Sequence, residues 1–547
     1  MTEENEPNNN KNKGNSNSFL KGTLILTVGG IVVKVIGFLN WIILSRVLGG
    51  EGIGLYQMAF PIYLLALSVS SAGIPVAISI ITAEKRALND FIGANRVFRV
   101  SLTVLVLTGL FFSFLLYFGA GWLIEYRFIR DPRAYYSLLA LAPAVFFVTI
   151  LSSYRGYLQG CQIMTPTAVS QIAEQLVRVI TMLIFASLLL PKGLEYAAGG
   201  ASLGAAPGAV AGLLVLIYYY IKLQKKGEKQ ETGQVSQMAQ ESSMSIIKRL
   251  IKLALPVSLS SLMLPIVANF DLFIVPARLE VAGYTVEQAT ELFGYLTGMA
   301  VPLLNLSTIL TAALATSLVP AISESFSLGN IKRIYQQTAA AMRIASLVTI
   351  PAFVALLILA QPISQMVYNA PQASPSISII SIGIVLLGIH QVTTGVLQGM
   401  GHTSIPLINM GGAAVFKIIL NWTLTSMPAL GIKGASWATV ADIGIAAVLN
   451  IYYVHRYVGF AVDIKSLVKP SVAAAVMGGI IYISYGIIMN ATSHVALATL
   501  TAMAVGVIVY GGVLVLIGGI SEGDMLQVPM LGSRVVSLLR KFGRVKN

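Results

Sequence analysis

The sequence predicts an all-α, polytopic membrane protein with about fourteen membrane-spanning helices. Of its 547 residues, 56% are hydrophobic and 11% are charged, whereas soluble proteins carry roughly 25% charged residues. The mean hydropathy is correspondingly high, at +0.79. Apolar segments longer than the roughly 20 residues that cross a hydrocarbon core recur along the chain. This composition excludes a soluble globular fold.

The apolar segments give the expected helices in order. They lie near residues 19–47, 53–82, 98–124, 134–158, 166–190, 198–222, 248–276, 292–322, 335–360, 376–398, 405–427, 432–456, 466–488 and 492–518. A glycine-rich hinge, Leu48 to Gly54, joins the first two segments, which together predict a membrane hairpin. The preceding residues 1–18 are rich in Asn, Glu and Lys, and we expect them to form a disordered tail.

The distribution of Lys and Arg predicts the orientation of the chain. With a cytoplasmic N-terminus, 25 basic residues fall in cytoplasmic segments and seven in external ones. The positive-inside rule therefore places both termini in the cytoplasm, including a basic tail at 521–547, in a multi-pass protein of the cytoplasmic membrane. The same rule explains the net charge of +14 without a nucleic-acid partner.

A polar segment at 223–247 divides the chain into two expected six-helix lobes. These are an N-lobe at 19–222 and a C-lobe at 248–456, followed by an extra helix pair at 464–520. The polar segment is expected to be a cytoplasmic linker.

Short motifs recur in the two lobes in the same order. Leu-Gln-Gly at 158–160 recurs at 397–399, and Gly-Ala-Ser at 200–202 recurs at 434–436. Ordered matches of this kind are typical of transporters built from two structural repeats around a central site. Each expected lobe has six helices and begins on the cytoplasmic side, so both repeats run in the same direction. This predicts a parallel repeat about an axis along the membrane normal.

Polar residues in the first apolar segment predict a wet interior. Lys34 and Asn40 lie within it and Arg46 near its end, and a charge in lipid costs about 2.5–3.5 kcal/mol on insertion scales. Their spacing of six and twelve residues spreads them over one broad helix face. We expect Lys34 and Arg46 to bind an anion, with a snorkelling or salt-bridged base as the alternative. Asn40 is a weaker binding candidate, because a single buried amide is also typical of helix packing.

Other intramembrane charges predict ion pairs or a coupling site. Glu174 and Arg178 are four residues apart, so they share a helix face and are expected to form a structural pair. Asp271, Lys417 and Asp442 fall on three separate expected helices and carry one spare negative charge. Two interpretations stay open for these three residues: a sodium or proton coupling site, or a buried ion-pair cluster.

No motif predicts catalysis or a resident cofactor. The four histidines, His390, His402, His455 and His494, have no partner at metal-ligand spacing. The single cysteine, Cys161, rules out an intramolecular disulfide. Since neither a nucleophile with its base nor a nucleotide motif is present, the chain is not expected to be an enzyme.

Several motifs resemble one family of membrane transporters. They are FLKGTLIL at 19–26, GFLN at 37–40, SRVLG at 45–49, EGIGLY at 51–56, GIPVAIS at 73–79 and QIAEQLVR at 171–178. They are similar to the stage V sporulation protein B-like group of the multidrug/oligosaccharidyl-lipid/polysaccharide (MOP) flippase superfamily. The likeness covers most of residues 19 to 520.

This resemblance implies fourteen helices, two lobes in a V and alternating access. It also implies that the chain flips undecaprenyl-pyrophosphate-linked saccharides or a peptidoglycan precursor for cell-wall, spore-cortex or exopolysaccharide synthesis. The lipid II flippases are cousins of this group, but where they often carry a second Arg this chain has Asn40. The expected partners are the lipid-linked substrate and membrane lipids, and the expected state is a monomer.

The main alternative is a cation-coupled multidrug or small-molecule exporter of the same superfamily. Such an exporter needs a cavity dominated by carboxylates and aromatic residues, whereas a flippase for a pyrophosphate needs a cationic cavity. Lys34 and Arg46 favour the flippase. A scaffold without transport would not require charges inside both lobes.

Overall fold

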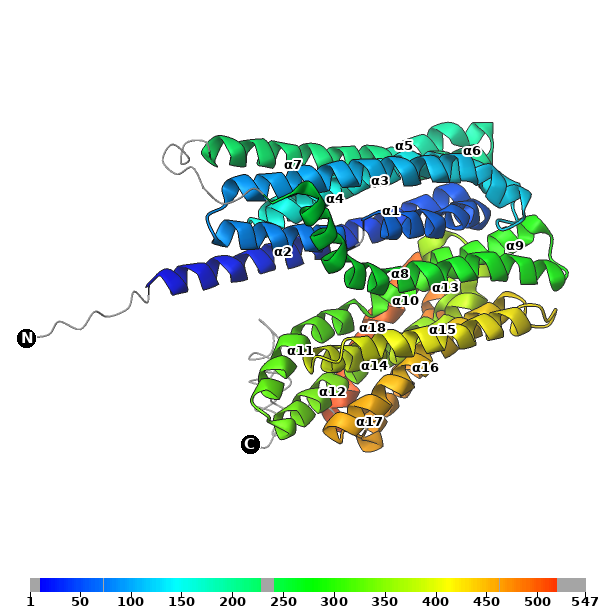
Figure 1. Ribbon diagram of the computed structural model, residues 1–547. Helices are drawn as coiled ribbons and strands as arrows, with labels where there is room; N and C mark the ends of the chain where they lie inside the picture. Colours follow the sequence, from blue (N-terminus) through cyan, green and yellow to red (C-terminus); the bar gives the residue numbers. More distant parts are fainter. Residues whose placement is uncertain (1–9, 72, 228–240, 462, 519–547) are drawn as a thin grey trace, which may run out of the picture. The chain divides into compact units, whose positions relative to one another are not determined.

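The computed structural model describes residues 10–71, 73–227, 241–461 and 463–518, and every regular element among them is a helix. The first seven α-helices are α1 (Asn10–Ser71), α2 (Ile74–Ala87), α3 (Phe91–Glu125), α4 (Tyr135–Gly160), α5 (Thr165–Leu189), α6 (Leu194–Leu203) and α7 (Ala205–Gly227). The others are α8 (Ser243–Val281), α9 (Val286–Phe293), α10 (Val301–Ser307), α11 (Ile309–Ser327), α12 (Ile331–Ile358), α13 (Ala360–Tyr368), α14 (Ser374–Gly399), α15 (Ser404–Leu424), α16 (Ile432–Val458), α17 (Ile464–Thr492) and α18 (Val495–Leu516). Three short 3-10 helices and one π-helical turn, Gly294–Ala300, complete the order (Figure 1).

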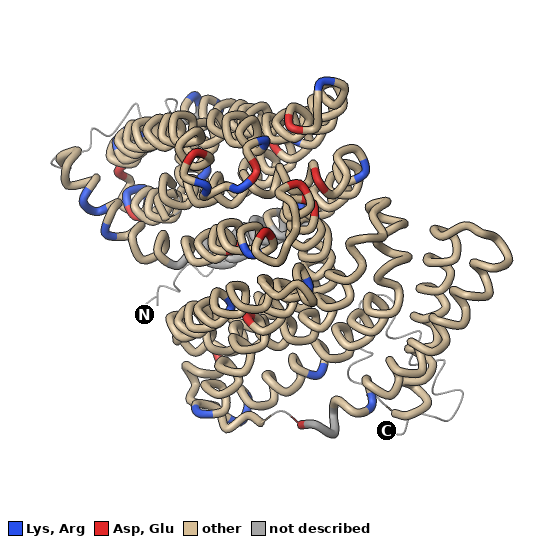
Figure 2. The backbone as a smooth tube through the Cα atoms, turned by 90° about the vertical axis from the view of Figure 1, so that its right-hand side faces the viewer, with Lys and Arg blue, Asp and Glu red and all other residues tan. Residues whose placement is uncertain are grey.

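Thirteen helical segments in the described part are long and apolar enough to cross a membrane. The first of these, Val32–Ala87, contains a break in α1 at Gly49, whose φ of 66° and ψ of −173° are not helical. Gly49 lies in the predicted hinge, and a glycine there takes a positive φ without a Cβ penalty. Figure 2 shows long uncharged stretches of helix, as the hydropathy requires. The all-α, polytopic membrane fold is confirmed, and the exact number of crossings stays a prediction.

The chain forms two compact units. Residues up to Ala277 and the segment Thr285–Gly294 form the first unit, and Arg278–Tyr284 and the residues from Tyr295 form the second. Helix α8 therefore belongs mainly to the first unit, although it begins the expected C-lobe at 248–456. Its Ser258 hydroxyl accepts a hydrogen bond from the backbone N–H of Gly73 at 3.0 Å. The repeat relation between the expected lobes stays a prediction.

Parts of the predicted domain scheme lie outside the described residues. These are residues 1–9, most of the linker at 223–247 and the basic tail at 521–547. Helix α1 begins at Asn10, within the segment expected to be a disordered tail. Helices α17 and α18 occupy the expected extra pair at 464–520 and contact each other.

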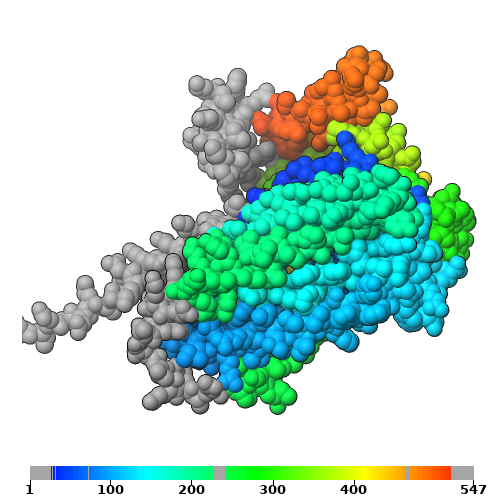
Figure 3. All heavy atoms as spheres, turned by 90° about the horizontal axis from the view of Figure 1, so that it is seen from above, coloured from blue at the N-terminus to red at the C-terminus, as the bar shows by residue number. Residues whose placement is uncertain are grey.

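The core of the first unit lies where α2, α3, α4 and α7 meet. Buried aliphatic side chains, among them Ile78, Leu105, Leu151, Leu158 and Leu216, form one cluster there. In Figure 3, α3 and α4 (blue to cyan) lie beside α5 and α7 (teal to green) on one face of this unit. A corresponding cluster in the second unit joins α11, α12, α14 and α16.

The expected single helix at 292–322 is broken in the structure. It comprises the end of α9, the π-helical turn, α10 and α11, with a further break at Thr308. Helix α9 starts at a capping box in which Thr285 and Gln288 satisfy each other's backbone N–H groups. A Cβ on Gly294 would lie 2.3 Å from the carbonyl oxygen of Gly50, so only glycine permits this approach of α9 to the break in α1. Hydropathy alone could not reveal a contact so distant in sequence.

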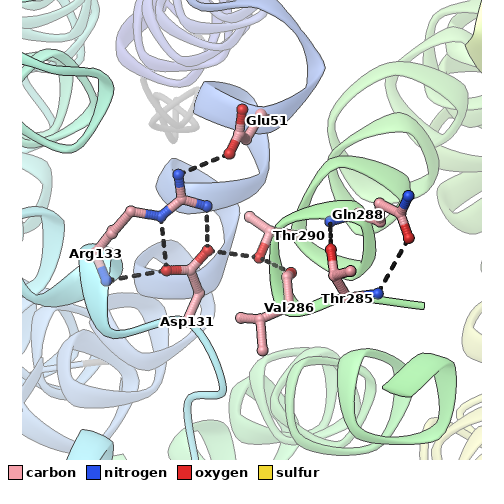
Figure 4. Close-up of polar contacts among 7 residues, drawn as sticks. All are labelled: Glu51, Asp131, Arg133, Thr285, Val286, Gln288 and Thr290. Carbon is pink, nitrogen blue, oxygen red and sulfur yellow. Dashed lines mark hydrogen bonds and ion pairs between the residues drawn. The ribbon is translucent and has the colours of Figure 1, made fainter. Parts of the chain in front are cut away.

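A polar network holds α9 to the broken part of α1 within the first unit (Figure 4). Asp131, which is 1% exposed, accepts hydrogen bonds from Arg133 Nη2 at 2.7 Å and from the Thr290 hydroxyl at 2.8 Å. Arg133 also pairs with Glu51 at 2.7 Å. We call Glu51, Asp131, Arg133 and Thr290 the Asp131 network. It connects three segments that are far apart in the sequence: the broken part of α1, the turn before α4, and α9.

Candidate substrate-binding site

The three predicted binding residues all lie on α1, in the first unit. The side chains of Lys34 and Arg46 are exposed, whereas Asn40 is 4% exposed. The Asn40 amide donates a weak hydrogen bond to the Met182 sulfur of α5 at 3.6 Å. Asn40 therefore packs between helices, and a binding role for Lys34 and Arg46 stays a prediction.

Helices α1 and α5 run parallel, and small residues allow their close approach. A Cβ on Gly29 would lie 3.0 Å from Ala168 Cβ, and one on Gly37 would lie 3.2 Å from Gln175 Nε2. These contacts and the Asn40–Met182 bond advance together along both helices. Lys34, between the two glycines, consequently lies at the level of Glu174. Arg46 lies beyond this series of contacts.

Glu174 forms its ion pair with a residue that the sequence did not suggest. Arg155 Nη2 lies 2.7 Å from Glu174 Oε2, and the same guanidinium donates to the Ser170 hydroxyl at 3.3 Å. Arg155 lies inside α4, and its side chain is only 18% exposed. The expected partner, Arg178, lies instead over the ring of Phe60 at 5.9 Å and contacts the Tyr56 hydroxyl.

An aromatic row on α1 faces Arg178 and was also missed. Trp41 packs edge-on against Tyr56 at 5.5 Å, Tyr56 stacks on Phe60 at 5.5 Å, and Phe60 lies 5.8 Å from Tyr63. The spacing of residues 56, 60 and 63 is the i, i+4, i+7 pattern of one helix face. That pattern was visible in the sequence, but it is equally typical of an ordinary core face.

Positive charge exceeds negative charge in this region. Lys34, Arg155 and Arg178 supply three positive charges along these helices, and Glu174 supplies one negative charge; the Lys34 side chain is exposed. We call these four residues and the aromatic row the α1–α5 site. Helix α7 supports it from behind, because a Cβ on Gly208 would lie 2.8 Å from the backbone oxygen of Glu174. Charged residues in membrane helices are rare and mark substrate or ion pathways, and an excess of bases suits an anion.

The predicted coupling cluster is divided between the two units. Lys417 Nζ and Asp442 Oδ2 lie 3.9 Å apart in the second unit, with side chains 7% and 17% exposed. Asp271 is partly buried on α8 and belongs to the first unit. The Lys417–Asp442 pair has the geometry that the ion-pair interpretation requires, and coupling through Asp271 stays a prediction. Within the described ranges, no group of three or more His, Cys, Asp or Glu side chains is placed to hold a metal ion.

Comparison with known families and sequences gives consistent matches. A family model described as polysaccharide biosynthesis protein matches residues 19–326, and a MatE model matches residues 296–423. Stage V sporulation protein B of Bacillus subtilis (strain 168) is 32% identical over 526 residues, which cover 95% of this chain and 99% of that protein. Lipid II flippase MurJ of the same organism is 27% identical over 556 residues, which cover 96% of this chain and 99% of that protein.

Solved structures show the same fold. The inward closed conformation of lipid II flippase MurJ gives a TM-score of 0.68 at 17% identity, covering 90% of this chain and 98% of that one. The inward-facing conformation of a multidrug resistance MATE family transporter of the MOP superfamily gives 0.65 at 17% identity, covering 80% and 98%. With a family model over more than half of its length and a relative 32% identical over 95% of it, the chain belongs to the polysaccharide biosynthesis protein family.

Proposed function

We propose that the chain is a flippase that moves an undecaprenyl-pyrophosphate-linked saccharide or peptidoglycan precursor across the cytoplasmic membrane. It acts by alternating access, as a monomer with both termini in the cytoplasm. The observation that carries this proposal is the excess of positive charge at the α1–α5 site, where Lys34, Arg155 and Arg178 outnumber Glu174. The family to which the chain belongs, and the printed names of its relatives, support the same substrate class.

The charge excess suits a pyrophosphate for a physical reason. An anion that enters a low-dielectric cavity loses its water shell, and its transfer is prohibitive unless fixed cations and hydrogen-bond donors replace that shell. Charge-assisted hydrogen bonds from guanidinium and ammonium groups are roughly twice as strong as neutral ones. Glu174 holds Arg155 in place at 2.7 Å, and its single negative charge cannot balance three bases. The site can therefore be ordered and still retain net positive charge.

The alternative function is a cation-coupled exporter of small molecules. The MatE match at 296–423 and the intramembrane carboxylate of Asp271 favour it. The charge balance of the α1–α5 site weighs against it, because a cationic drug would meet a net positive surface there.

The proposal is tested by flipping of a labelled undecaprenyl-pyrophosphate saccharide in vesicles that contain the purified protein. We expect Lys34→Ala to abolish flipping, because it removes a cation at the level of the site. It should not impair insertion, since loss of a charge makes the helix easier to insert. Lys192→Ala is the matched control, because Lys192 is an exposed base of the same unit in the turn after α5.

Two results would contradict the proposal. Wild-type protein that flips no lipid-linked saccharide, but exports cationic dyes down a sodium or proton gradient, would establish the alternative. Lys34→Ala protein that inserts normally and flips at the wild-type rate would return Lys34 to a snorkelling role. Arg46→Ala, predicted from the sequence to behave like Lys34→Ala, tests whether the site extends beyond the α1–α5 contacts.

A further inference from the structure

The second unit contains a cavity that the α1–α5 site does not explain. It has a volume of about 400 Å³ and lies between α11 and α14, within the range of roughly 300–1,000 Å³ typical of small-ligand pockets. His390, Gln391, Thr394 and Gln398 of α14 supply most of its polar groups, and α11 contributes Thr316 and small or apolar residues. None of its lining residues carries a formal charge at neutral pH if His390 is neutral.

The sequence explains why these polar groups form one surface. His390, Thr394 and Gln398 are four residues apart, so they follow a single stripe of α14, with Gln391 beside it. A Cβ on Gly395 would lie 2.7 Å from the backbone oxygen of Ala315, so glycine brings α11 and α14 together there. Gln398 and Thr316 are exposed, whereas His390 and Gln391 are partly buried.

Buried amides hold the cavity wall in position from behind. Asn450 of α16 is fully buried and donates to the Thr394 hydroxyl at 2.9 Å, and its amide nitrogen lies 3.3 Å from His390 Nδ1. Asn409 of α15 donates to Asn450 Oδ1 at 2.8 Å. The Thr311 hydroxyl likewise donates to Gln391 Oε1 at 2.5 Å. These hydrogen bonds orient His390, Gln391 and Thr394, as a preorganised binding surface requires.

The few polar groups of this otherwise apolar wall suit a neutral ligand that carries hydrogen-bonding groups. Carboxamide, hydroxyl and imidazole groups can both donate and accept, which suits sugar hydroxyl and acetamido groups. An anion would require bases and a cation would require carboxylates, and the lining residues include neither. We propose that the α11–α14 cavity binds the saccharide part of the lipid-linked substrate. This inference rests on the proposed function and deepens it.

The test compares binding of two lipids to the purified full-length protein: undecaprenyl pyrophosphate, and the same lipid carrying a disaccharide. We expect Gln391→Leu and Gln398→Leu each to weaken binding of the disaccharide lipid by roughly threefold to tenfold, as expected for loss of a neutral hydrogen bond. Binding of the sugar-free lipid should not change. Gln398→Leu is at the exposed mouth of the cavity and should fold normally, and Gln365→Leu, an exposed glutamine of α13, is the matched control.

The outcomes separate this inference from the proposed function. Wild-type protein that binds neither lipid would contradict the proposed function, and the inference with it. Wild-type protein that binds both lipids, with Gln391→Leu and Gln398→Leu changing neither or weakening both equally, would overturn only the saccharide site. Selective loss of the disaccharide lipid in both variants, with Gln365→Leu unchanged, would establish it.

Discussion

Replacing Asp131 by Asn should destabilise the protein far more than replacing Glu51 by Gln, although both carboxylates pair with Arg133. Asp131 is 1% exposed and accepts four hydrogen bonds, three from Arg133 at 2.7–3.0 Å and one from Thr290 at 2.8 Å. Glu51 has a side chain 34% exposed and a single ion pair at 2.7 Å. Hydrogen bonds to a buried charge contribute about 1.5–3 kcal/mol, whereas an exposed ion pair contributes about 0–1 kcal/mol.

We therefore expect Asp131→Asn to lower the free energy of unfolding by about 1.5–3 kcal/mol, because Asn accepts at only one atom and turns N–H donors toward the guanidinium. Glu51→Gln should cost about 1 kcal/mol or less. Unfolding by SDS in mixed micelles, followed by tryptophan fluorescence, measures both values against wild type. The refuting result is a Glu51→Gln loss equal to or greater than that of Asp131→Asn. It would mean that the exposed Glu51–Arg133 ion pair stabilises the protein at least as much as the buried hydrogen bonds of Asp131.

Three further predictions address packing, reactivity and coupling. Gly54→Ala should sharply reduce the yield of folded protein, because the added Cβ would lie 2.0 Å from a backbone oxygen of α9. Gly119→Ala is the control and should not reduce the yield, because no described atom lies within 4 Å of its added Cβ. Equal yields of the two variants would contradict the close packing. Burial raises the pKa of the Cys161 thiol, and the Arg86 guanidinium partly opposes this rise. Because the thiolate is the reactive form, maleimide labelling of Cys161 at pH 7.5 should be slower than labelling of a free thiol. Labelling should be slower still in Arg86→Ala. Asp271→Asn should weaken transport while substrate binding is retained; unchanged transport over a range of sodium and pH would leave only the ion-pair interpretation.

The fold was predictable wherever hydrophobicity alone decides it. Long apolar runs must form helices in lipid, because every backbone polar group has to be satisfied within the segment. Tertiary contacts determined where the expected helices are broken. The run at 292–322 contains no charged residue, yet Gly294 approaches Gly50 and a π-helical turn replaces continuous helix. The capping box at Thr285 and Gln288 was present in the sequence, but nothing local indicates that α9 packs against α1.

The candidate site shows the same division between local and tertiary information. The sequence identified Glu174 and Arg178 as intramembrane charges, and their spacing made a local pair the natural prediction. In the structure Arg155 reaches Glu174 from another helix at 2.7 Å, and the aromatic row accommodates Arg178. The sequence identifies which residues are charged. Which charges pair across helices depends on how the helices pack, and the sequence alone does not show this.

The two units present different chemistry, and this difference bears on the choice between flippase and exporter. At the α1–α5 site, the carboxylate of Glu174 is already engaged by Arg155, which leaves the charge of Lys34 and Arg178 in excess. The lining of the α11–α14 cavity contains hydrogen-bonding groups and no carboxylate. A cationic drug would find no available acidic group in either place. The α1–α5 site therefore suits an anionic group, and the α11–α14 cavity suits a neutral group that carries hydroxyls.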